Sequence, residues 1–106
     1  NPRVLDTLGF SLYQQGRFEE AAATLERAQQ RARHQAPEVQ DEIAFHLARA
    51  WVRAGQPGRA QDVLRVLRER RPGLLLPKDL TELMRTPALP PPAADGRELD
   101  LDTGVR

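Results

Sequence analysis

Few side chains in this chain of 106 residues are of a type that supports catalysis. There is no cysteine, the two histidines are His34 and His46, and Ser11 is the only serine. Ser11 lacks the Gly-x-Ser-x-Gly frame of a hydrolase nucleophile, and no His-x3-His pair offers a zinc site. Gly55 and Gly58 stand in a short turn rather than in a phosphate-binding loop. We therefore expect no catalytic residue, no metal site and no cofactor.

Charge and hydropathy argue against a nucleic-acid partner and against a membrane-spanning segment. The formal net charge is +1, from 16 basic and 15 acidic residues, and Lys78 is the only lysine. The basic runs at 31–33 and 68–71 are interleaved with neutral or acidic residues, so we interpret them as solvated helix ends rather than a nucleic-acid surface. No apolar run approaches the ~20 residues that a bilayer requires. We expect no nucleic-acid partner and no membrane-spanning segment.

Apolar residues recur every three or four positions along most of the chain, which is the spacing of an amphipathic helix. The spacing predicts helices over residues 3–15, 18–34, 38–54, 58–71 and 79–86. The first helix is expected to bury Val4, Leu5, Leu8 and Leu12. Asp79 and Glu82 are spaced as a capping box at the start of the last helix.

One segment of the chain occurs twice. It reads LGFSLYQQGRFEEAAATLERA at residues 8–28 and LARAWVRAGQPGRAQDVLRVL at residues 47–67, an offset of 39 residues. Gly16 and Gly55 hold equivalent elbows, where a left-handed backbone favours glycine. The small residues Gly9 and Ala48 stand where two helices approach closely, and Trp51 is expected in the core. This pattern resembles the tetratricopeptide repeat, a helix–turn–helix unit of 34 residues.

The resemblance implies an all-α, right-handed superhelix of helical hairpins with a short C-terminal capping helix. The domains are then residues 2–36, a first repeat with an extended second helix; 37–73, a second repeat; 74–86, the capping helix; and 87–106, a disordered Pro-rich and acidic tail. We assign the five residues beyond 34 to the run QQRARHQ, which lengthens the second helix. Because the chain starts with Asn1 rather than Met, we expect it to be the C-terminal end of a longer array.

In this family the first helix of each repeat lines a concave groove that holds a peptide or a partner helix. Aligned to the Leu-Gly signature, the residues implied for this face are Arg3, Asp6, Phe10, Tyr13, Gln14, Glu42, Phe45, His46, Arg49, Val52 and Arg53. Aromatic residues and arginine are the types that anchor interfaces. The alternative is that these side chains pack against neighbouring repeats. One branch of the family grips a peptide's C-terminal carboxylate with Lys, Asn and Arg, and the residues here, Asp6, Phe10, Glu42 and His46, do not provide that clamp.

The resemblance therefore implies a protein-binding scaffold. The sequence of residues 1–16 is similar to that of the closing repeats of long bacterial repeat proteins, including those that serve exopolysaccharide export and PEP-CTERM sorting. We therefore expect the protein to act within a larger bacterial assembly. The compartment, bacterial cytoplasm or periplasm and cell envelope, stays open. Two alternatives are the regulatory or structural C-terminal end of a multidomain enzyme and a self-associating array cap. The acidic stretch 95–102 is either a partner-binding motif or a solvated terminus.

Overall fold

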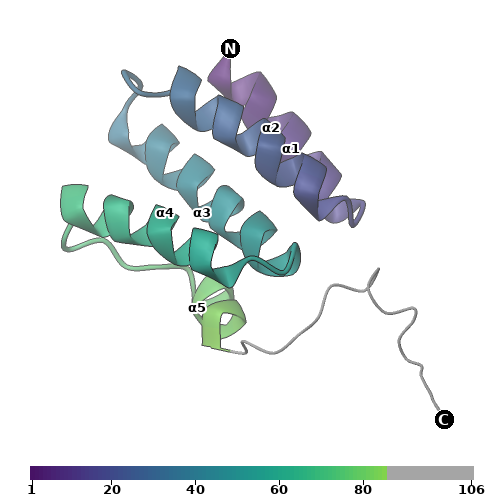
Figure 1. Ribbon diagram of the computed structural model, residues 1–106. Coiled ribbons are helices and arrows are strands. Elements are labelled where there is room, and N and C mark those ends of the chain that lie inside the picture. Colours follow the sequence, from purple (N-terminus) through teal and green to yellow (C-terminus); the bar gives the residue numbers. More distant parts are fainter. Residues whose placement is uncertain (86–106) are drawn as a thin grey trace, which may run out of the picture.

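The computed structural model describes residues 1–85, and within this range it contains five α-helices and no strand (Figure 1). The helices are α1 Pro2–Gln14, α2 Phe18–Arg31, α3 Pro37–Arg53, α4 Pro57–Arg70 and α5 Lys78–Arg85. The predicted all-α class is confirmed, and every helix begins within one residue of its expected start. The predicted tail, 87–106, lies outside the described residues.

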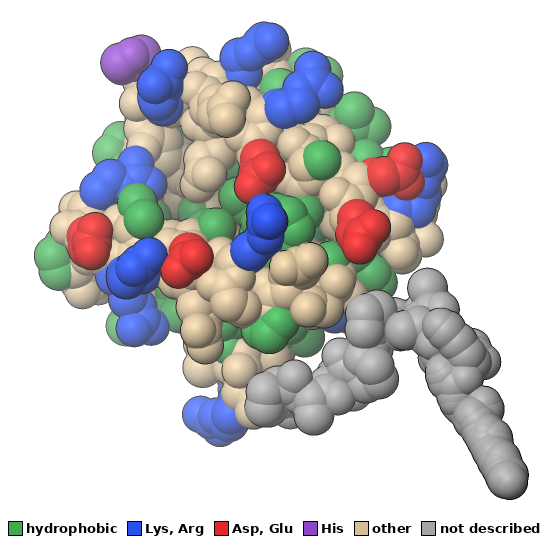
Figure 2. Space-filling view, in the orientation of Figure 1, with side chains coloured by type: hydrophobic (Ala, Val, Ile, Leu, Met, Phe, Trp, Pro, Cys, Tyr) green, Lys and Arg blue, Asp and Glu red, His purple; other side chains and the backbone are tan. Residues whose placement is uncertain are grey.

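The helices form two layers. In Figure 1, α2 and α4 lie in front and α1 and α3 lie behind them, while α5 lies below α4 and contacts α3. α2 packs against both α1 and α3, so it joins the two hairpins, and α3 contacts all four other helices. On the side of α2 and α4, acidic and basic side chains are interspersed rather than gathered by sign (Figure 2). Among the described helices, none is both long and apolar enough to cross a bilayer.

The two elbows between helices have the same geometry. Gly16 and Gly55 both have a φ of 82°, which an L side chain rarely adopts. In the first elbow the N–H of Arg17 donates to the carbonyl of Leu12 at 3.0 Å, and in the second Gln56 donates to Trp51 at 2.8 Å. These bonds satisfy carbonyl groups at the ends of α1 and α3 that the helices leave without a partner. The expected equivalence of the two elbows is confirmed.

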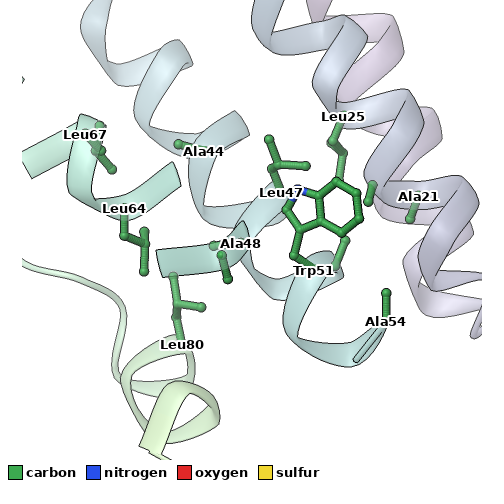
Figure 3. Close-up of a cluster of buried hydrophobic side chains, with 13 residues drawn as sticks. Ala21, Leu25, Ala44, Leu47, Ala48, Trp51, Ala54, Leu64, Leu67 and Leu80 are labelled. Atoms are coloured by element: carbon green, nitrogen blue, oxygen red, sulfur yellow. The ribbon is translucent and has the colours of Figure 1, made fainter. Parts of the chain in front are cut away.

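The core centres on Trp51 of α3, whose side chain is almost fully buried. Figure 3 shows the indole beside Leu47 and turned toward Leu25 of α2, so it packs at the junction of the two hairpins. The guanidinium of Arg59 lies 4.8 Å from the centre of the indole ring. Leu80 of α5 is fully buried in the same cluster, which attaches α5 to the second hairpin.

α1 approaches α2 most closely at Gly9. A Cβ atom placed on this residue would lie 2.5 Å from Cγ of Leu25, well inside van der Waals contact. Leu25 is fully buried in the core, so it has no open space into which to move. Gly9 therefore lets α1 and α2 lie closer together than any larger residue would allow. The equivalent position in the second hairpin, Ala48, is also fully buried.

The expected extension of the second helix to residue 34 is wrong. α2 ends at Arg31 and has 14 residues, the same length as α4. Pro37 starts α3, and Ala36 before it has a ψ of 148°, so α2 cannot continue into α3 as one helix. The side-chain amide of Gln40 donates to the carbonyls of Arg33 and Gln35, which fixes the turn between the helices. The five residues by which the spacing of the two copies exceeds 34 therefore lie in this turn and in α3, which has 17 residues.

The predicted burial of Val4 and Leu8 is also wrong, since their side chains are 64% and 48% exposed. The residues 39 positions later in the chain, Ile43 and Leu47, are fully or almost fully buried. α2 packs over this face of α3, whereas no helix within residues 1–85 packs over the equivalent face of α1. The same repeat position is therefore core in the second hairpin and exposed in the first.

Replacing Gly9 by alanine should destabilise the protein. The new methyl group must displace the buried side chain of Leu25, and overpacking of this kind typically costs ~1–3 kcal/mol. Gly58→Ala is the matched control, because a Cβ at that position meets no atom within 4 Å. We expect this control to change stability by less than about 1 kcal/mol, and in the stabilising direction. Urea unfolding followed by circular dichroism measures both, and equal stability of the two variants would contradict the close contact.

Candidate partner-binding surface

Four of the residues predicted for the concave face come together between α1 and α3: Asp6, Phe10, Glu42 and His46. Asp6 of α1 meets His46 of α3, with 2.7 Å between its Oδ1 atom and the Nδ1 atom of the imidazole. Both side chains are largely buried, at 16% and 14% exposure. The ring of Phe10 stacks on the imidazole with 4.5 Å between ring centres and 26° between planes. These contacts join the first helices of the two hairpins into one surface.

A row of aromatic rings continues from this contact along α1. Tyr13 stacks with Phe10 at 6.0 Å between ring centres, and it meets the edge of Phe18 of α2 at 5.4 Å. The guanidinium of Arg53 lies 4.8 Å from the centre of the Phe18 ring, a cation–π contact from the end of α3. The row itself comes from the first hairpin, and α3 of the second hairpin contacts both of its ends, through His46 at Phe10 and Arg53 at Phe18.

Arg49 has a partner within the protein. Its Nε and Nη2 atoms donate to the two carboxylate oxygens of Asp79 on α5 at 2.8 and 3.1 Å. This bidentate pair favours the ionised carboxylate and lowers the pKa of Asp79 below its ordinary value. α5 begins at Lys78, so Asp79 lies in the first turn of the helix, where its carboxylate also accepts backbone hydrogen bonds from Asp79 and Leu80.

The remaining predicted residues have different environments. Phe45 and Val52 are partly buried and pack against the main core cluster. Arg3, Gln14 and Glu42 are exposed. Glu42 lies one helical turn before His46, and its carboxylate belongs to the same group of charged side chains as Asp6 and His46. Arg3, Gln14 and Glu42 are therefore fully accessible to a partner, whereas Phe10, Tyr13 and Phe18 are accessible in part.

Two charged contacts are not indicated by the local sequence. Arg71, which we interpreted as a solvated helix end, pairs with the nearly buried carboxylate of Asp41 at 3.1 Å. Its neighbour Arg70 donates to the side-chain oxygen of Gln40 at 2.7 Å. Both contacts connect the start of α3 to the end of α4 and close the second hairpin. The expectation of a solvated side chain is therefore wrong for Arg71, which is partly buried, whereas Arg70 is exposed as expected.

Comparison with known proteins identifies the family. A family model described as Tetratricopeptide repeat matches residues 12–75, which is more than half of the chain. The chain belongs to the tetratricopeptide repeat family. No curated protein and no solved structure matches it significantly. Tetratricopeptide repeats generally mediate protein–protein interactions, and they are typically scaffolds without catalytic activity.

Asp79→Asn should lower the free energy of unfolding at neutral pH, because it removes the ion pair that attaches α5. The loss should not exceed about 1 kcal/mol, because the Asp79 carboxylate is 66% exposed and solvent screens the pair. Arg49 lowers the pKa of Asp79 in the folded protein. The difference in unfolding free energy between the wild type and the variant is therefore complete above the pKa of Asp79 in the unfolded chain, about 3.9. This difference in unfolding free energy is lost as the pH falls through the lower pKa of Asp79 in the folded protein.

Urea unfolding of the wild type and the variant at neutral pH and at about pH 2 measures this difference. Asp62→Asn is the control, because Asp62 pairs only with Arg65 three residues along the exposed side of α4. An Asp79→Asn difference that persists unchanged at low pH would contradict the assigned role of the ion pair.

Proposed function

We propose that the inner face formed by α1 and α3 binds a peptide or a partner protein. The observation that carries the proposal is the aromatic row from Phe10 through Tyr13 to Phe18, which lies next to charged side chains from both hairpins. Large apolar surfaces with a few placed charges favour protein interfaces. The family membership supports the same class of function, because its repeats generally mediate protein–protein interactions.

The side chains of this face are already held in place, which favours affinity. Phe10 is fixed against His46, Tyr13 against Phe18, and Arg53 over the Phe18 ring. A partner that docks here would not have to order these residues, so less of the interaction free energy is lost to conformational entropy. The exposed residues Arg3, Gln14 and Glu42 are then free to supply polar contacts at the rim.

The assembly in which this binding takes place is a further part of the proposal. The sequence of the first sixteen residues is similar to that of bacterial repeat proteins of exopolysaccharide export and PEP-CTERM sorting, which favours a role in a larger bacterial assembly. The concave face carries Asp6, Phe10, Glu42 and His46 where a carboxylate clamp has Lys, Asn and Arg. The partner segment is therefore an internal or helical segment rather than a free C-terminus.

A charge-reversal experiment tests which face binds. The purified protein selects ligands from a displayed peptide library, and the affinity of an enriched peptide is measured by fluorescence anisotropy. The inner-face variant is Arg3→Glu, Gln14→Glu and Arg53→Glu. The control is Arg27→Glu, Gln30→Glu and Arg68→Glu, which makes the same chemical changes at exposed positions of α2 and α4.

We expect the inner-face variant to bind at least about tenfold more weakly, which corresponds to ~1.4 kcal/mol, and the control to keep its affinity. Circular dichroism verifies that both variants fold. If no peptide is enriched, or if the control loses as much affinity as the inner-face variant, the proposal is refuted.

A second candidate function, self-association or stacking on another hairpin, is favoured by the exposed apolar face of Val4 and Leu8. These residues occupy the positions at which Ile43 and Leu47 are buried under α2. Sedimentation equilibrium of the protein at rising concentration should then show association that Val4→Ser with Leu8→Ser abolishes. Association that survives this double substitution, or a monomer at all concentrations, would exclude the α1 face as a self-association surface.

A further inference from the structure

Three side chains with metal-binding groups converge on the inner face. They are Asp6 from α1 and Glu42 and His46 from α3, and one ligand atom from each lies within 4.8 Å of the other two. Glu42 and His46 are four residues apart, so they stand on one face of α3, a single turn from each other. Asp6 reaches the same point from the other hairpin, forty positions earlier in the chain.

The charges of this cluster do not balance. Two carboxylates surround one imidazole, so the cluster keeps a net charge of at least −1 even with a protonated histidine. Three arginines belong to the inner face: Arg49 pairs with Asp79, Arg53 lies over the Phe18 ring, and Arg3 is exposed, so solvent screens its charge. The arrangement therefore favours a cation from outside the protein. An imidazole among the ligands favours a metal ion, because imidazole nitrogen is a common metal ligand.

The three side chains are near enough to reach one ion. Zinc takes histidine nitrogen and carboxylate oxygen at about 2.0–2.2 Å, which places tetrahedral ligands ~3.4 Å apart. The three ligand atoms lie within 4.8 Å of one another, and Asp6 and His46 touch directly at 2.7 Å, so an ion would replace this contact and draw in Glu42 by side-chain rotation. Phe10 stacks on the imidazole and holds its plane, so His46 does not need to be ordered on binding. Asp6 and His46 are largely shielded from water, which strengthens their attraction for a cation.

We propose that Asp6, Glu42 and His46 bind one divalent transition-metal ion of the zinc type at the junction of the two repeats. Calcium and magnesium prefer all-oxygen sites, so the imidazole disfavours them. The fourth position of the ion is open to water or to a donor group of a bound partner. Because the ligands come from α1 and α3, the ion ties the two hairpins together on the inner face. No local sequence pattern reveals this set, since only Glu42 and His46 share a helix.

The test uses the untagged full chain, freed of metal with a chelator, and titrates it with Zn²⁺ by calorimetry. Co²⁺ serves as a spectroscopic probe, because its visible absorption reports a low-coordinate site with nitrogen and oxygen ligands. We expect one Zn²⁺ per chain with a dissociation constant of about 10 μM or tighter. We also expect Co²⁺ to bind the same site and to be displaced by Zn²⁺.

Glu42→Gln should weaken Zn²⁺ binding at least about tenfold, and because Glu42 is exposed this variant keeps its fold. His46→Gln should weaken it further. His34→Gln is the matched control, since His34 is the other histidine and is exposed in the turn between α2 and α3. The absence of saturable Zn²⁺ binding, an unchanged affinity in Glu42→Gln, or an equal loss in His34→Gln would each overturn the proposal.

Discussion

At Gly9 the backbone of α1 lies directly against the buried side chain of Leu25, with no room for a methyl group between them. Leu25 belongs to the same core cluster as Trp51, so the position of α1 is set relative to α3 through α2. A residue larger than glycine would push α1 outward and separate Asp6 and Phe10 from His46. One close contact inside the first hairpin therefore controls the surface between the hairpins.

The inner face that results is held by its own side chains. The Asp6–His46 contact joins the two hairpins, the Arg49–Asp79 pair attaches α5, and Arg53 covers Phe18. These contacts leave a surface with few degrees of freedom, which suits a scaffold that binds a flexible partner. They also place two carboxylates beside His46, and the proposed metal ion would offset this negative charge on the same face as the proposed interface.

The sequence predicted the helices well because their signals are local: the apolar period, the elbow glycines and the prolines at helix starts act within a few residues. The end of α2 was missed because the polar run after Arg31 has a composition typical of a helix, although the chain forms a turn there before α3 starts at Pro37. Contacts such as Asp41–Arg71 and Arg49–Asp79 join residues thirty positions apart, so spacing along one helix cannot indicate them. The repeat alignment placed Asp6 and His46 on one face, but only the packing of α1 against α3 shows that they touch.

The central claim is that the first helices of the two repeats form one continuous surface. The most direct measurement is the nuclear Overhauser contact between the ring protons of Phe10 and those of His46 in the free protein. The structure places these rings 4.5 Å apart between centres, so strong cross-peaks between them are expected. Resolved Phe10 and His46 ring signals without such cross-peaks would show that α1 and α3 do not form a single surface.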